Sequence, residues 1–415
     1  MATLFSPATL RTCSLGHKPR PSKRKTRPCK PASTAPLANS WATKATTSAP
    51  ALFDKATQSL KGAGDGNHTA LAICLVNRGT VAKFRGDADA VVADAQAALA
   101  QLGTPRPGQR ALAISARSLL ADGLGMRGRS GPAIEQYERT IADLGAAGRE
   151  RTLLAAIILN NFGSLLSNSG LTLRAATTYE HALDRARGVQ AADDLLPPLE
   201  TNYAKILVEL GRANEAKPIF ERVMAVASRR GHPRAIGFVA LAAAAAWRET
   251  GDLARSEAFL TQARSQLQAT LPANHSAFAA LEVSTARLDL ARRAPADARA
   301  HLDRALAIYA TASEAAPSRI KALELLARVE QQLNEGAAAR EHAAKAVALA
   351  REIAGGLTHI EWLGSALLAQ GAVLAAQGDK PAAQAALREA LAQLQASVGD
   401  EAPATREARA LLAGS

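Results

Sequence analysis

The sequence predicts an all-α fold, a right-handed superhelix of about eight stacked helical hairpins preceded by a disordered basic tail. Three observations predict this class. A loop signal recurs about every 42 residues, the same residue types accompany each loop at helical spacings, and the chain is 48% hydrophobic but only 4% aromatic. Alanine dominates the apolar residues. It is the strongest helix former and lets helices approach closely, so many packed helices are favoured over a sheet.

The loop signal is a glycine that follows a helical stretch, most often in a Gly-Asp or Gly-Arg pair. Gly170 lacks the polar partner, and Arg293 and Asn334 replace the glycine in two weaker copies. Glycine fits the left-handed backbone that ends one helix and begins the next. The loop residues are 40 to 44 positions apart, at Gly86, Gly128, Gly170, Gly211, Gly251, Arg293, Asn334 and Gly378. Unrelated loops would not keep this period, so one unit is repeated.

Fixed offsets around each loop residue predict the faces along which the helices pack. Small or apolar residues stand five positions after the loop, larger ones usually nine after, and mostly small ones twelve after. Offsets of four and three place all of these on one face of a second helix. Seven positions before the loop, another small residue stands in the first helix, at Gly79, Ala121, Gly163, Ala204, Ala244, Ala286, Ala327 and Gly371. Small residues there let the two helices of a hairpin touch.

This combination resembles the tetratricopeptide repeat. The clearest copy runs from Asn160 through Gly163 to Leu166, then the loop at Gly170, then Ala175 to Leu183. The usual unit has about 34 residues. The longer unit here is similar to the variant of kinesin light chains and of many bacterial sensor and scaffold proteins. The resemblance covers residues 70–397, and its sixth and seventh copies lack the loop glycine.

The same phase divides the chain into segments. Residues 70–403 are expected to form the solenoid, residues 404–415 a capping helix, and residues 49–69 a partial repeat and hinge. Residues 1–48 combine Pro, Ser, Thr, Lys and Arg and cannot bury enough apolar surface to fold, so they are expected to be disordered. This tail is either a solvated segment of no specific role, a transit peptide, or a nuclear signal at 22–27.

The net charge of +13 belongs mainly to the tail. The first 50 residues hold nine of the 50 Lys and Arg and no acidic residue, which leaves 41 basic against 37 acidic residues elsewhere, or +4. The body therefore does not predict a nucleic-acid partner. The three cysteines, Cys13, Cys29 and Cys74, have no disulfide or metal spacing and indicate a reducing compartment. A cytoplasmic location is expected, or an organelle if the tail is a transit peptide, and no apolar run predicts a membrane span.

The sequence predicts no catalytic, cofactor-binding or metal-binding residue, and hence no enzyme. It contains no G-x-x-x-x-G-K-[ST] phosphate loop and no protein-kinase signature set. The eight histidines do not stand at the i, i+4 spacing of a metal pair. The sequence His359-Ile360-Glu361 begins a zinc-deaminase motif, but no Pro-Cys-x-x-Cys follows it.

A binding site is expected on the concave face, which the first helices of such hairpins line. With the loop residue numbered 15 in each unit, Asn77, Asn161 and Asn202 all fall at position 6. An amide can donate to and accept from a peptide bond at once. The resemblance to kinesin light chains implies such a clamp for Asn161 and Asn202, and less securely for Asn77. The alternative is that they pair with a neighbouring helix of the stack.

Basic residues follow the asparagines on the same face. Positions 9 and 12 hold Lys83, Lys205, Arg248, Arg287 and Arg328. If they share one wall, the groove favours an acidic peptide or a terminal carboxylate. The alternative is ordinary solvated charge, and the nearby Asp122, Glu249 and Glu324 make the groove mixed.

These observations predict a non-catalytic protein–protein interaction module, a scaffold or a signalling sensor that holds a peptide or partner protein in its groove. One alternative is a detached repeat region of a bacterial serine/threonine kinase or transcriptional regulator, whose repeats are similar. The other is an organelle-targeted assembly or RNA-associated repeat protein. The sequence leaves open the partner, the pathway, the oligomeric state, whether the tail is a targeting signal, and whether a kinase or DNA-binding domain is encoded upstream.

Overall fold

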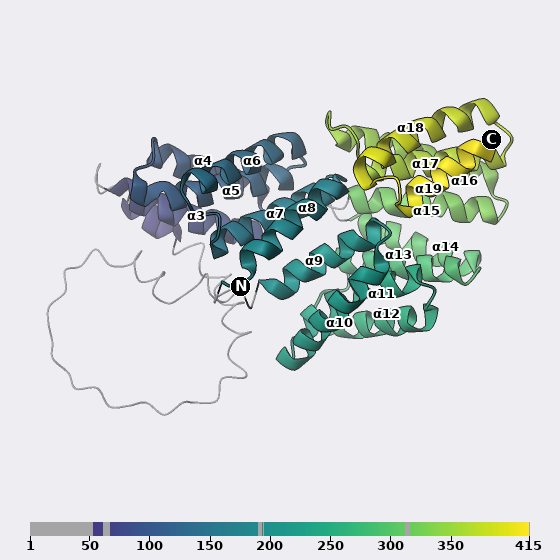
Figure 1. Ribbon diagram of the computed structural model, residues 1–415, viewed down its shortest axis with the longest axis horizontal. Coiled ribbons are helices and arrows are strands. Elements are labelled where there is room, and N and C mark those ends of the chain that lie inside the picture. Colours follow the sequence, from purple (N-terminus) through teal and green to yellow (C-terminus); the bar gives the residue numbers. More distant parts are fainter. Residues whose placement is uncertain (1–52, 61–66, 190–192, 194, 312–315, 415) are drawn as a thin grey trace. The chain divides into compact units, whose positions relative to one another are not determined.

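A computed structural model describes residues 53–60, 67–189, 193, 195–311 and 316–414. Within these ranges the regular elements are helices, with no strand. The chain divides into two compact units, the first ending at Gly148 and the second beginning at Arg149. Figure 1 shows the helices of each unit in chain order. The expected disordered tail at 1–48 lies outside the described residues, as does the glycine-rich stretch at 61–66.

The described helices form eight hairpins, two in the first unit and six in the second. The first unit contains α3 (His68–Phe84), α4 (Ala88–Leu102), η3 (Pro107–Gln109), α5 (Arg110–Met126) and α6 (Ser130–Ala146). The second contains α7 (Leu153–Asn168), α8 (Thr172–Ala186), α9 (Leu196–Glu209), α10 (Ala213–Arg230), α11 (Pro233–Glu249), α12 (Leu253–Gln268), α13 (Ser276–Ala291), α14 (Pro295–Tyr309), α15 (Ala316–Gln332), α16 (Gly336–Ala354), α17 (Glu361–Ala376), α18 (Lys380–Val398) and α19 (Pro403–Gly414). The prediction of an all-α solenoid of about eight hairpins is confirmed.

The eight predicted loop residues share one backbone conformation. The six glycines have φ between 72° and 84°, and Arg293 and Asn334 have φ of 61° and 63°. All eight therefore end a first helix in the left-handed region, which costs an L residue roughly 1 kcal/mol more than glycine. The two substituted copies keep the turn because packing on both sides of it determines the backbone.

The acidic partner of the glycine caps the next helix. The side chains of Asp87, Asp252 and Asp379 accept hydrogen bonds from the backbone N–H groups of Ala90, Arg255 and Ala382. Such N-cap bonds satisfy a donor that the helix leaves unpaired and contribute about 1 kcal/mol each. The recurring Gly-Asp pair is thus one C-terminal stop and one N-terminal cap in succession.

The small residues of the first helices allow the close hairpin contacts that the sequence predicts. A Cβ added to Gly163 would lie 2.7 Å from the ring of Tyr179, and one added to Gly371 would lie 2.6 Å from Leu387. The larger side chain nine residues after the loop therefore fills the space that the small residue leaves. At five residues after the loop every side chain is buried, at Val91, Ala133, Ala175, Ala216, Ser256, Ala298, Ala339 and Ala383.

The ends of the described chain pack against their neighbours. Residues 53–60 are helical, and Phe53, which is only 4% exposed, contacts Val81 of α3. The carboxylate of Asp54 pairs with the guanidinium of Arg78 on α3 at 2.8 Å. At the other end α19 packs on α17 and α18 and buries Thr405 and Ala408.

Within the second unit, the hairpin α7–α8 meets the hairpin α17–α18. The backbone N–H of Glu361 donates to the carbonyl of Gly170 at 2.8 Å, and the indole N–H of Trp362 donates to the carbonyl of Asn168 at 3.3 Å. Pro403 at the start of α19 contacts Gly211, so the next loop along is covered as well. We call these contacts the seam. Because of the seam, the inner face of this unit is bounded at both ends.

Candidate functional site

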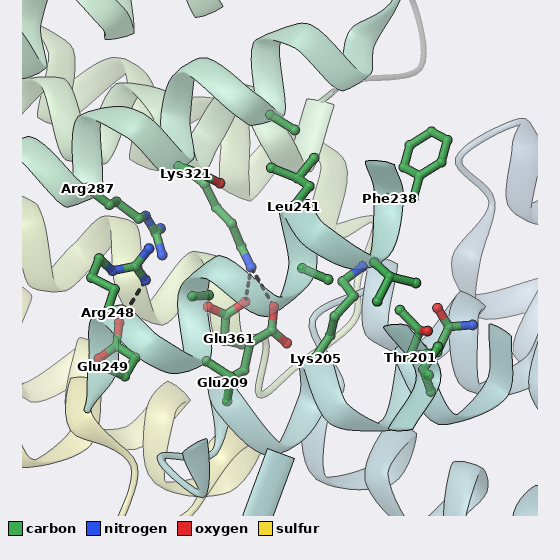
Figure 2. A pocket seen from close by; sticks show the side chains of 18 of the residues that line it. Thr201, Lys205, Glu209, Phe238, Leu241, Arg248, Glu249, Arg287, Lys321 and Glu361 are labelled. Carbon is green, nitrogen blue, oxygen red and sulfur yellow. Dashed lines mark hydrogen bonds and ion pairs between the residues drawn. The ribbon is translucent and has the colours of Figure 1, made fainter. Parts of the chain in front are cut away.

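A pocket of about 930 Å³ lies inside the second unit. The first helices of five successive hairpins, α9, α11, α13, α15 and α17, line it together with α19, part of α10 and the end of α18. Figure 2 shows its central part. The pocket lies on the face where the repeat pattern places position 6, 9 and 12 residues. We call it the inner pocket.

Five of the eight residues predicted for the groove line the inner pocket, namely Asn202, Lys205, Arg248, Arg287 and Arg328. Asn161, on α7, is not among the lining residues. Asn77 and Lys83 lie on α3 in the first unit, where Lys83 pairs with Asp122 at 2.6 Å. The structure thus gathers the predicted residues of α9, α11, α13 and α15 in one place.

The asparagines form a chain between α7 and α9. The amide of Asn202 donates to the side-chain oxygen of Asn160 at 3.2 Å, and the amide of Asn160 lies 3.5 Å from the oxygen of Asn161. This is the pairing within the stack that the sequence left open as an alternative to a peptide clamp. It uses one of the two N–H donors of Asn202, whose side chain also lines the pocket.

Lys321 occupies the centre of the pocket (Figure 2). Its ammonium nitrogen lies 3.3 Å from a carboxylate oxygen of Glu209 on α9 and 3.3 Å from one of Glu361 on α17. Burial acts to lower the pKa of Lys321, but attraction by the two carboxylates outweighs it and the pKa is raised. Lys321 is therefore charged at neutral pH and links three helices of the second unit.

Two arginines lie side by side at one end of the pocket (Figure 2). Arg248 on α11 is only 8% exposed and pairs with Glu249 at 2.7 Å. Burial, followed by repulsion from Arg287 on α13, lowers the pKa of Arg248. Arg287 reaches the carboxylate of Glu324 only at 3.9 Å, beyond hydrogen-bond distance. This end therefore holds two adjacent cations, of which Arg248 is paired at hydrogen-bond distance and Arg287 is not.

Glu324, on α15, is an acidic residue whose carboxylate is largely buried and poorly paired. Its side chain is 12% exposed, and its Oε2 atom is buried without a hydrogen-bond partner. Burial raises the pKa of Glu324 to about 7, although Arg287 opposes the shift. The group therefore titrates near neutral pH.

The opposite side of the pocket is more apolar. Phe238 on α11 is 36% exposed, and Leu241 of the same helix lies on its side of the pocket (Figure 2). In Figure 2, Phe238 and Thr201 lie across the view from Arg248 and Arg287, with Lys321 between them. The guanidinium carbon of Arg234 lies 5.8 Å from the centre of the Phe238 ring. A ligand along the pocket would meet an apolar surface, a balanced ion cluster and a cationic pair.

Sequence reasoning missed Phe238 and Lys321 for one reason. Each stands 13 residues before its loop residue, since 251 − 238 and 334 − 321 both equal 13. That is position 2 of the unit, four before position 6 and hence on the same helix face. The interpretation considered only positions 6, 9 and 12. Extending the series by one helical turn would have found both residues.

Two other kinds of site were sought in the part of the chain that the structure describes. No group of three His, Cys, Asp or Glu side chains there is arranged to hold a metal ion. None of the described helices has the length and apolarity needed to cross a bilayer.

Comparison with known proteins supports the fold. No protein-family profile and no curated protein sequence matches the chain. Among solved structures, a Rap protein in complex with competence and sporulation factor aligns with a TM-score of 0.58 and 12% identity, covering 83% of this chain and 99% of that one. The apo form of the quorum sensor NprR from B. thuringiensis aligns with a TM-score of 0.58 and 11% identity, covering 86% of this chain and 97% of that one.

A third structure, a tetratricopeptide repeat protein from Parabacteroides merdae, aligns at 16% identity with a TM-score of 0.45, covering 68% of this chain and 96% of that one. The two alignments with a TM-score of 0.58 support a fold of stacked helical hairpins. The period, the left-handed loop residues and the small-residue hairpin contacts of this chain are those of the tetratricopeptide type. In fold, the chain is a tetratricopeptide-repeat solenoid.

Proposed function

We propose that the second unit binds a short peptide segment of a partner protein in the inner pocket, and that the chain acts as a non-catalytic adaptor or sensor. The observation that carries this proposal is the pocket itself. Its volume of about 930 Å³ lies within the range of roughly 300–1,000 Å³ that is usual for ligand pockets. Its walls come from the repeated inner helix faces, and the seam gives it a defined length.

The lining chemistry supports a peptide over other ligand classes. Six Lys and Arg and five Glu line the pocket, at 205, 230, 248, 287, 321 and 328 and at 209, 249, 324, 361 and 407. These charges nearly balance, so the pocket lacks the excess of positive charge that binding a phosphate backbone requires. A peptide, in contrast, presents backbone donors and acceptors together with apolar and charged side chains. The side chains of Thr201 and Asn202 offer hydrogen-bond partners to a peptide backbone, and Phe238 offers a contact for an apolar side chain.

The solved structures of like fold agree with this reading. One of them holds a competence and sporulation factor, and the other is a quorum sensor. We extend a ligand-binding role to this chain on the basis of its own pocket, and the same proposal covers a scaffold or a signalling context for the partner.

Affinity selection tests the proposal. The full chain is immobilised and incubated with a synthetic pool of random hexapeptides, and the retained peptides are identified by mass spectrometry. We expect a defined subset to be enriched and the enrichment to fall at least tenfold in the double variant Lys205→Ala/Arg287→Ala. The matched control is Lys345→Ala/Arg351→Ala, which removes two cations of α16 that are 55% and 58% exposed and are not pocket residues.

The control variant is expected to retain the same peptides as the unmodified chain. If no peptide is enriched, or if both double variants lose binding equally, the inner pocket is not a peptide site.

A further inference from the structure

The cationic end of the inner pocket contains an acid whose surroundings do not suit its charge. Four charged groups face Glu324: Arg287 from α13, Glu361 from α17, and Lys321 and Arg328 from its own helix. Three of them are engaged elsewhere or repel it. Lys321 is held by two other carboxylates, Arg328 pairs with Glu407 of α19 at 2.8 Å, and Glu361 is itself an anion.

Arg287 is then the remaining source of compensation, and it is a poor one. The shortest separation between its guanidinium and the Glu324 carboxylate is 3.9 Å, and Oε2 of Glu324 is buried with no hydrogen-bond partner. A buried carboxylate oxygen without a partner is destabilised relative to a paired one. The pocket therefore holds an unfavourable arrangement that a ligand would relieve.

A ligand carboxylate at the arginine pair would relieve it in one specific way. It would accept hydrogen bonds from Arg248 and Arg287 and lie beside Glu324. Two carboxylates that share one site cannot both remain ionised without a large penalty, so one of them takes up a proton. Glu324 is the better candidate because it is buried, and its protonated form can donate a hydrogen bond to the carboxylate beside it.

We propose that the arginine pair of the inner pocket is a subsite for a carboxylate of the bound peptide, either an acidic side chain or the free C-terminus, and that Glu324 takes up one proton from solvent when this carboxylate binds. The inference rests on the proposed peptide-binding function and names the ligand group that the pocket selects. The step involves no bond change other than protonation: one Glu324 carboxylate and one proton from water give one carboxylic acid.

Proton uptake makes the affinity depend on pH in a defined direction. Burial raises the pKa of Glu324 to about 7. Binding that requires the protonated acid is strongest below this value and weakens above it. Between pH 6 and pH 8 the protonated fraction of such a group falls about tenfold, and the affinity should fall by up to the same factor.

The test repeats the hexapeptide selection at pH 6 and at pH 8 with two pools, one with free C-termini and one amidated. We expect the enriched peptides to carry at least one carboxylate. We also expect their apparent affinity, measured by fluorescence polarisation of a labelled enriched peptide, to fall several-fold to tenfold from pH 6 to pH 8. In Glu324→Gln the amide imitates the protonated acid, so the affinity should remain high at both pH values.

Glu407→Gln is the matched control. It also removes a pocket carboxylate, but one that is 43% exposed and already paired with Arg328, so the pH dependence should persist in it. Enrichment of peptides without a carboxylate, or an affinity of the unmodified chain that is equal at pH 6 and pH 8, would overturn this inference alone. The same holds if Glu324→Gln keeps the full pH dependence. Enrichment of no peptide at either pH would overturn the proposed function, and this inference with it.

Discussion

The backbone N–H of Glu361 donates to the carbonyl oxygen of Gly170 at 2.8 Å and joins the hairpin α17–α18 to the hairpin α7–α8. The side chain of the same glutamate lies 3.3 Å from Lys321 in the inner pocket. One residue therefore belongs both to the seam and to the proposed site. An inner face that a longer array would leave open at each end is here a pocket of fixed size.

The lysine at the centre of this arrangement should stabilise the second unit. Lys321→Met would leave the carboxylates of Glu209 and Glu361 without their shared cation. We expect a loss of about 1 to 2 kcal/mol in the free energy of unfolding, less than for a fully buried pair because Lys321 is 29% exposed. Urea denaturation measures it. Lys345→Met, which breaks an exposed pair within α16, should change the same quantity by less than about 0.5 kcal/mol.

The two loop residues that are not glycine should be strained. Arg293→Gly would place glycine at φ of 61° and should raise the free energy of unfolding by about 1 kcal/mol. Gly251→Arg, in the equivalent loop at φ of 84°, should lower it by a similar amount. Thermal denaturation of both variants is the measurement. Shifts of the same sign would mean that the two loops are not equivalent positions of one repeat.

Close packing within the first unit predicts a contrast between two glycines. A Cβ on Gly123 of α5 would lie 2.8 Å from the side chains of both Val91 and Val92 of α4, whereas a Cβ on Gly131 of α6 would have no heavy atom within 4 Å. Gly123→Ala should therefore destabilise the unit by about 1 to 3 kcal/mol. Gly131→Ala should be neutral or slightly stabilising, because it lowers the entropy of the unfolded chain. Urea denaturation of the two variants side by side decides the matter.

Glu324 should make stability depend on pH even without a ligand. Its pKa is raised from 4.5 to about 7 on folding, chiefly by burial, so the folded chain binds the proton more tightly than the unfolded chain. The stabilisation is full below pH 4.5 and is lost as the pH rises to about 7. It amounts to at most about 3 kcal/mol. The difference in unfolding free energy between the unmodified chain and Glu324→Gln, followed from pH 4.5 to 8, isolates this group. A difference that is constant over that range would contradict the assigned environment.

Much of the fold could be predicted from the sequence because each repeat fixes its own local contacts. The left-handed conformations of Arg293 and Asn334 followed from the phase of the repeat. Arginine rarely adopts that conformation, whereas asparagine tolerates it better than most residues. Burial at five positions after each loop followed from helical geometry. These features depend on neighbours close in sequence, and the pattern repeats eight times.

The seam could not be predicted in the same way, because it joins residues as distant as Asn168 and Trp362, 194 positions apart. Its location depends on the accumulated curvature of several hairpins, which no single repeat encodes. One signal was nevertheless present. Gly170 is followed by Leu171 where the other glycine loops carry Asp or Arg, and Leu171 is only 9% exposed.

The candidate site was predictable in part for a related reason. Repeat numbering placed Arg248 and Arg287 on the inner face. It could not show that the two arginines lie side by side, or that Arg287 lies 3.9 Å from Glu324 of another helix. Nor could it decide that Asn202 bonds to Asn160, since an amide satisfies a neighbouring helix as readily as a ligand.

Hydrogen–deuterium exchange of the full chain, with and without the most enriched hexapeptide, tests the central claim most directly. The account predicts that added peptide slows exchange in α9, α11, α13 and α15, which line the inner pocket, while α12, α14 and α16 change little. Protection confined to those second helices, or to the first unit, would contradict the claim that the inner pocket is the binding site.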